Sequence, residues 1–171
     1  MTILVVGIGN PWASDDGVGG EAVRCLRDRL AMTPAAGRPA ARLLALRQPD
    51  ASLLDALGDC ERLIVVDAVR SGAPPGTRHR VAWTPGCVEE RGVARTSSHG
   101  LGVHDLLELA AALGRLPAHV ELWGVEISST QPGQGLTPEV TRALPALVES
   151  LLAVMLTAGD EASPGETKPG C

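Results

Sequence analysis

Two acidic sites, one of them a pair of aspartates, and one histidine are best suited to chemistry in this sequence. Asp15 and Asp16 stand side by side after an apolar segment, Asp67 follows a second apolar segment, and His99 follows a serine pair. In an α/β protein, positions where strands give way to loops share one edge of the sheet, where ligands bind. Two carboxylates and an imidazole form a mixed oxygen and nitrogen donor set. Such a set suits nickel, zinc, manganese or a similar divalent ion.

Each of these positions also has a purely structural explanation. An aspartate in front of a helix caps free amide groups, and Asp67 could bind backbone amides in a loop. Two adjacent carboxylates with no lysine nearby repel each other, so one of Asp15 and Asp16 is expected to need a cation or a proton. A helix N-terminus favours the neutral imidazole of His99, the form that binds metals. The other three histidines are expected to be surface or core residues: His79, His104 and His119.

The elements that must position these residues alternate between strand and helix patterns, which is typical of an α/β fold. Asp15 or Asp16 is expected to be the N-cap of the helix that starts near residue 18. Ser97 and Ser98 are expected to open the helix over 101–113, and Thr137 is expected to cap the helix that starts at residue 138. We expect strands over residues 2–6, 42–46, 63–66, 78–83 and 120–127, and helices over 18–30, 51–57, 101–113 and 138–155.

The remaining segments lack a hydrophobic period. Residues 84–96 are expected to form a loop over the site. Residues 158–171 are polar and rich in Gly and Pro, which predicts a disordered tail. We see no internal repeat, so the chain is expected to fold as one domain over residues 1–157.

Composition excludes several classes of protein. The 171 residues carry a net charge of −5, and Lys168 is the only lysine, which argues against a nucleic-acid partner. The four cysteines form no Cys-x-x-Cys pair, so reduced thiols and a cytoplasmic location are expected. No apolar run approaches the ~18 residues of a membrane span. Nothing suggests a long exposed apolar edge, so we expect a monomer.

Six short blocks occur in order between about residue 2 and residue 156. The blocks are Gly7-Ile8-Gly9-Asn10, Asp15-Asp16-Gly17-Val18-Gly19, Val65-Val66-Asp67-Ala68, Ser98-His99-Gly100-Leu101, Gly124-Val125-Glu126 and Gly135-Leu136-Thr137-Pro138. Together they resemble the maturation endopeptidases of nickel-iron hydrogenases. A lone Gly-x-Gly-Asn would be a weak signal, whereas six ordered blocks are specific.

The resemblance implies an α/β three-layer sandwich of the phosphorylase/hydrolase-like type, with a twisted, mostly parallel sheet of about five strands between helices. It implies an aspartic-type endopeptidase that removes the C-terminal extension from the hydrogenase large-subunit precursor after nickel insertion. By motif position, the metal-contacting and catalytic residues fall on Asp16, Asp67 and His99. Nickel is expected to come with the substrate precursor, and other divalent ions are expected to be able to substitute for it.

This chain departs from the family pattern at two places. The family often has glutamate where Asp16 stands, and aspartate is shorter by one methylene group. The segment from Arg47 to Asp50 differs from the Asp-Gly-Gly-Thr type of loop in some members. We take that segment as a candidate specificity element.

Other function classes share part of the pattern. Peptidyl-tRNA hydrolase-like hydrolases also begin with a strand and Gly-x-Gly-Asn-Pro, as residues 7–11 do, but they need a histidine closely followed by asparagine and a basic surface. A receiver-like module needs a lysine on a late strand, and Lys168 lies beyond the fold. A dinucleotide-binding module needs a third glycine where Trp12 stands. A non-catalytic metal-binding relative is a further alternative, and the endopeptidase accounts for more of the sequence than any of these.

Overall fold

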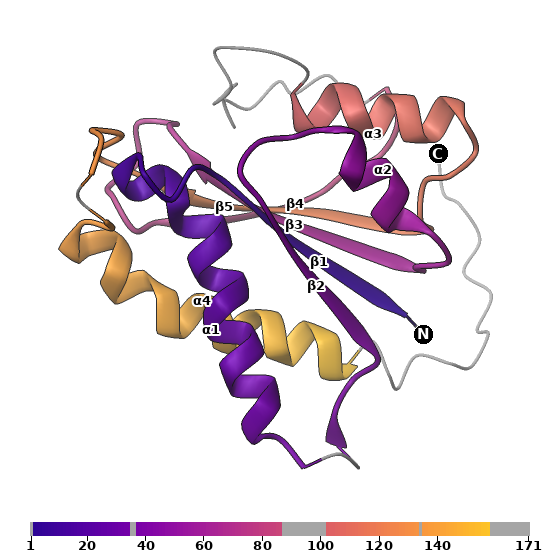
Figure 1. Cartoon of the computed structure of the whole chain (residues 1–171), viewed down its shortest axis with the longest axis horizontal. Helices are drawn as coiled ribbons and strands as arrows, with labels where there is room; N and C mark the ends of the chain where they lie inside the picture. Colours follow the sequence, from indigo (N-terminus) through magenta and orange to yellow (C-terminus); the bar gives the residue numbers. More distant parts are fainter. Residues whose placement is uncertain (1, 35–36, 87–101, 134, 158–171) are drawn as a thin grey trace, which may run out of the picture.

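A single sheet with helices on both faces forms the centre of the molecule (Figure 1). The structure is a computed structural model that describes residues 2–34, 37–86, 102–133 and 135–157. In chain order, its elements are β1 (Ile3–Ile8), the 3-10 helix η1 (Ser14–Gly17), α1 (Val18–Met32), β2 (Ala41–Leu46), α2 (Ala51–Leu57), β3 (Arg62–Val69), β4 (Arg78–Ala82), α3 (Val103–Ala112), β5 (His119–Glu126) and α4 (Pro138–Thr157).

The five strands lie in the order β2-β1-β3-β5-β4. The pairs β1–β2, β1–β3 and β3–β5 are parallel, and the edge strand β4 runs antiparallel to β5. This confirms the predicted α/β sandwich with a mostly parallel sheet. The chain leaves β1 toward β2 on one side and reaches β3 on the other, so the strand order reverses between β1 and β3. A reversal of this kind opens a crevice at the carboxyl ends of the two strands.

Each face of the sheet has its own apolar core. Alternate residues of β1 point to opposite faces, so that Ile3 and Val5 pack with α1 and α4, whereas Leu4 and Val6 pack with α2 and α3. Figure 1 shows α1 and α4 on one side of the sheet and α2 and α3 on the other. The buried residues of α4 form an apolar stripe: Val140, Leu144, Leu147, Val148, Leu151 and Met155.

Several predicted element boundaries are wrong in an informative way. The N-cap of α1 is Gly17, which has no side chain to cap with, and both aspartates lie one turn earlier in η1. Strand β3 runs two residues beyond Asp67, because its pairing with β5 continues to Val69. Helix α3 begins at Val103 after the N-cap Gly102, so Leu101 precedes it. The serine pair at 97–98, most of the loop predicted over 84–96 and the tail predicted over 158–171 lie outside the described residues.

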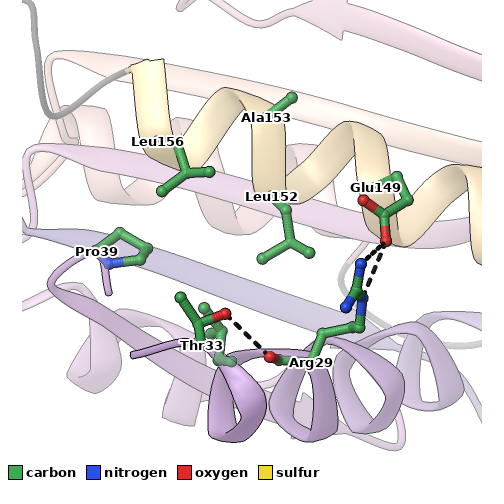
Figure 2. A pocket seen from close by; sticks show the side chains of 8 residues that line it. Arg29, Thr33, Pro39, Glu149, Leu152, Ala153 and Leu156 are labelled. Atoms are coloured by element: carbon green, nitrogen blue, oxygen red, sulfur yellow. Dashed lines mark hydrogen bonds and ion pairs between the residues drawn. The ribbon is translucent and has the colours of Figure 1, made fainter. Parts of the chain in front are cut away.

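Helix α4 is long and apolar enough, by length and composition alone, to cross a membrane. Core helices of soluble proteins pass the same test, so the finding is weak evidence for a span. In this molecule α4 packs against α1 and β5. An ion pair of 2.6 Å between Arg29 Nη2 and Glu149 Oε1 joins the exposed sides of the two helices. A pocket of about 280 Å³ lies beside this ion pair. Figure 2 shows Leu152 and Leu156 of α4 pointing toward it.

Two glycines allow α1 to approach the sheet closely. A Cβ atom at Gly19 would overlap the carbonyl oxygens of Ile8 and Val66, and a Cβ atom at Gly7 would overlap the carbonyl group of Gly19. These overlaps involve backbone atoms that cannot rotate away. Helix α1, and therefore η1 in front of it, is held against the ends of β1 and β3 because positions 7 and 19 have no side chain.

Adjacent glycines in α1 provide a matched test of this packing. We expect Gly19→Ala to lower the free energy of unfolding by about 3 kcal/mol, because the added methyl group overpacks a backbone contact. Gly20 has no atom within 4 Å of a built Cβ, so we expect Gly20→Ala to be neutral or to stabilise by up to about 1 kcal/mol through helix propensity. Urea unfolding of both variants measures the difference, and equal effects would contradict the close approach.

Candidate active site

The carboxyl ends of β1 and β3 bring Asp16 and Asp67 to the same place. Val66 of β3 pairs with Gly7 of β1, and Asp67 follows it. Asp16 lies in η1, which packs against β3. Both aspartates are partly buried. Two of the three predicted site residues therefore lie together at the switch point of the sheet.

The loop from β1 to η1 folds back on itself to place Asp16. Gly9 has a φ of +141°, and a Cβ atom there would overlap the Asp16 carbonyl oxygen, so only glycine fits the turn. The Asn10 N–H donates to Asp16 Oδ2 at 2.8 Å. Ser14 has a φ of +51° and is buried, a conformation that non-glycine residues adopt at a cost and that the surrounding contacts must hold. The Asp16 carboxylate is fixed by the loop it belongs to.

Asp67 has a strongly perturbed acidity. Burial raises its pKa to about 7, the charge of Asp16 adds to this effect, and a hydrogen bond of 2.8 Å from the Ala68 N–H to Asp67 Oδ1 opposes it. A carboxylate is destabilised in a partly dry site beside a second acid. This pair of side chains favours either a shared proton or a cation, and perturbed acidity in a crevice is typical of functional sites.

Asp15 has a different role from its neighbour. Its side chain is 0% exposed, and its carboxylate accepts five hydrogen bonds from the segment between β5 and α4. These are Ser128 N at 3.0 Å, Ser128 Oγ at 3.2 Å, Ser129 N at 3.1 Å, Thr137 N at 2.6 Å and Thr137 Oγ1 at 3.1 Å. Burial raises the pKa of Asp15, but the hydrogen bonds outweigh it and the net pKa is lowered. Asp15 stays ionised as the anchor of this segment.

More contacts tie the same two segments together. The Asp15 N–H donates to the Ser129 carbonyl at 3.1 Å, and the Gly133 N–H donates to the Trp12 carbonyl at 2.8 Å. The Ser14 hydroxyl donates to the Gly135 carbonyl at 2.8 Å. The two neighbouring aspartates therefore have different roles. Asp15 joins distant parts of the chain, whereas Asp16 lies near Asp67 and raises its pKa. The idea that one aspartate caps α1 is wrong.

His99, the third predicted ligand, lies outside the described residues. Among the residues that the structure describes, no group of three His, Cys, Asp or Glu side chains is arranged to hold a metal ion. Asp16 and Asp67 supply two carboxylates of the predicted set, and the histidine remains a prediction.

A second buried acid, which was not predicted as a site residue, lies at this edge. Glu126, at the end of β5, is 2% exposed and accepts from Ser71 N, Ser71 Oγ and Gly72 N at 2.8, 2.8 and 2.9 Å. His79 Nε2 lies 3.2 Å from Glu126 Oε2. Burial raises the pKa of Glu126, but the hydrogen bonds from these partners outweigh burial, and the net pKa is lowered. The apolar residues around Glu126 in β5 were the available signal, because an acid inside such a strand needs partners.

The other histidines and the segment from Arg47 to Asp50, which were considered in the sequence, lie away from the two aspartates or have structural contacts. His104 Nδ1 accepts from the Trp83 indole N–H at 2.9 Å, and His119 is exposed at the start of β5. Asp50, the last residue of the proposed specificity segment, is the N-cap of α2 and accepts from the Ser52 N–H at 2.8 Å. That segment is therefore a short β2–α2 connection whose end is fixed by a cap.

The anchor role of Asp15 can be tested by removing its charge. Asp15→Asn keeps the size of the side chain but sets an amide group against N–H donors, so we expect the free energy of unfolding to fall by about 3 kcal/mol. We expect turnover to fall as well, because Asp16 lies on the loop that Asp15 fixes. Asp28→Asn, at an exposed ion pair on α1, is the control and should cost less than about 1 kcal/mol. Equal losses in urea unfolding would contradict the anchor.

Comparison with known proteins agrees with this geometry. A family model described as hydrogenase maturation protease matches residues 49–154. The hydrogenase expression/formation protein HupD of Thiocapsa roseopersicina is 32% identical over 158 residues, covering 92% of this chain and 69% of the relative. The hydrogenase 2 maturation protease of Escherichia coli is 30% identical over 169 residues, covering 97% of this chain and 98% of the relative.

Solved structures give the same result. The hydrogenase maturating endopeptidase HybD from E. coli has a TM-score of 0.75 at 28% identity, covering 93% of this chain and 94% of that one. The hydrogenase maturation protease HycI from Thermococcus kodakarensis has a TM-score of 0.69 at 20% identity, covering 90% and 92%, which shows the fold. The chain belongs to the hydrogenase maturation protease family and is an endopeptidase.

Proposed function

We propose that this protease removes the C-terminal extension from the nickel-loaded precursor of a nickel-iron hydrogenase large subunit. The observation that carries the proposal is the placement of Asp16 beside Asp67, where the charge of one carboxylate disfavours the charge of the other. A cation that arrives with the substrate relieves this repulsion. The relatives named as hydrogenase maturation proteases support the choice of substrate.

The substrate's own nickel suits the donor set. Carboxylate oxygens from Asp16 and Asp67, with the imidazole of His99 as the proposed third donor, offer ligands that divalent nickel accepts. Other divalent ions of similar chemistry should bind to the same groups. An ion that the precursor already holds would join enzyme to substrate only after metal insertion, so an empty precursor would forfeit the contact. Cleavage would then depend on nickel loading.

We assign an aspartic-type mechanism. Asp67 has a pKa of about 7, which is the range that proton transfer at neutral pH requires. Ser14, the serine nearest in sequence to Asp16, donates its hydroxyl to a backbone carbonyl. The two aspartates are therefore the groups we place against the scissile bond, with His99 beside them.

The setting of the reaction is part of the proposal. The thiols of Cys25 and Cys60 are free, which suits the reducing cytoplasm where we place the enzyme. With a net charge of −5, the chain has no affinity for nucleic acid in this proposal. We expect it to act as a monomer on a protein substrate, away from any membrane.

Cleavage of matched precursors tests the substrate and the role of nickel. We expect the wild-type chain to process the nickel-loaded large-subunit precursor and to leave the nickel-free precursor intact, as measured by the product mass. Asp16→Asn should lower cleavage of the loaded precursor by about a hundredfold or more, because one donor to the ion is lost. Asp28→Asn carries the same chemical change on an exposed ion pair and should leave the rate unchanged. Equal cleavage of both precursors would refute nickel recognition.

The acidity of Asp67 predicts an unusual pH dependence of stability. Since the folded pKa lies near 7 and the unfolded value near 3.8, the folded state holds a proton between these values that the unfolded state releases. The stabilising effect of this proton is therefore present at low pH and is lost as the pH rises through about 7. We expect the free energy of unfolding of wild type relative to Asp67→Asn to fall between pH 5 and pH 8. A constant difference in urea unfolding would show that Asp67 has an ordinary pKa.

A further inference from the structure

The chain contains three aromatic residues of the Phe, Trp and Tyr type, all of them tryptophans. Trp83 and Trp123 are buried, and their indole N–H groups donate to His104 Nδ1 and Glu121 Oε2, both at 2.9 Å. Trp12 is 68% exposed, and its indole has no hydrogen-bond partner among the described residues. Two tryptophans serve the fold, whereas the third places a large apolar surface in water.

The backbone around Trp12 is rigidly held although its side chain is exposed. The Trp12 N–H donates to Asn10 Oδ1 at 3.1 Å, and the Trp12 carbonyl accepts from the Gly133 N–H at 2.8 Å. These bonds tie the residue to its own loop and to the segment between β5 and α4. An exposed indole on a fixed backbone loses little conformational freedom when a partner covers it, which favours binding.

The position of Trp12 determines which partner it would meet. Asn10, which bonds to Trp12 through its side chain, donates its backbone N–H to the Asp16 carboxylate. Trp12 therefore lies on the same short loop as Asp16, four residues before it. In Figure 1 the loop after β1 and the loop before α4 lie at the same end of the sheet. A polypeptide whose cleavage site meets Asp16 therefore meets the loop that also carries Trp12.

We propose that Trp12 is a docking contact for the hydrogenase large-subunit precursor, covering an apolar segment of that polypeptide next to the scissile bond. The inference rests on the proposed function and adds a binding residue to it. Tryptophan is the residue type most enriched among contacts that dominate protein interfaces, because it buries a large apolar area with few rotatable bonds. The segment it meets would be recognised by apolar surface, whereas Asp16 and Asp67 meet the ion.

Steady-state cleavage of the nickel-loaded precursor separates this role from catalysis. We expect Trp12→Ala to raise KM about tenfold or more, with kcat and the thermal unfolding midpoint close to wild type. Trp12→Phe should recover most of the loss, because an aromatic surface is retained. Met32→Ala and Leu156→Ala remove other exposed apolar side chains, 80% and 50% exposed on α1 and α4, and should leave KM unchanged.

Three results would overturn the proposal. One is an unchanged KM for Trp12→Ala, and another is a fall in kcat alone, which would mean that Trp12 only shapes the loop. The third is a wild-type dimer, seen by sedimentation, that becomes a monomer in Trp12→Ala with KM unchanged, since Trp12 would then meet a second copy. Failure of the wild-type chain to cleave the precursor would contradict the proposed function instead. Calorimetric binding of the uncleaved precursor to wild type and Trp12→Ala still tests the contact in that case.

Discussion

The buried carboxylate of Asp15 is the interaction on which the site depends. It joins the loop after β1 to a segment more than 110 residues later in the chain, through three backbone N–H groups and two hydroxyl groups. A charge in so dry a place is stable only while all of these donors are present. The two segments therefore form one unit, and that unit carries both Asp16 and Trp12.

This division between neighbouring aspartates explains how an acid pair can exist without a lysine beside it. Hydrogen bonds stabilise the charge of Asp15 inside the fold, whereas Asp16 lies close enough to Asp67 for its charge to raise the pKa of Asp67. Burial of Asp67, with the charge of Asp16 beside it, raises the pKa of Asp67 to about 7. The ionised form of Asp67 is destabilised here, which favours binding of a cation or of a proton by the two carboxylates. Such a local conflict within an otherwise consistent fold is typical of a functional site.

Topology explains why the site lies where it does. The reversal of strand order between β1 and β3 leaves the carboxyl ends of these two strands uncovered by a crossover connection. The missing side chains of Gly7 and Gly19 then let α1 and η1 close on that edge from one face. As a result, Asp16 from η1 and Asp67 from β3 lie at the same edge of the sheet. A second buried acid, Glu126, fixes the segment that follows β3 in the same manner as Asp15 fixes the segment before α4.

The sequence by itself determined the elements and the family. Apolar periodicity gives the strands and helices to within a few residues, since the core faces of β1, β3 and α4 must be apolar wherever they pack. The ordered blocks predict Asp16, Asp67 and His99 as site residues. Only the tertiary structure decided which member of the Asp15–Asp16 pair is structural, that Asp67 lies inside β3, and that Glu126 and Trp12 belong to the same edge. These facts depend on contacts between residues far apart in the chain. The spacing of apolar and polar residues along a segment does not determine which distant segment it will contact.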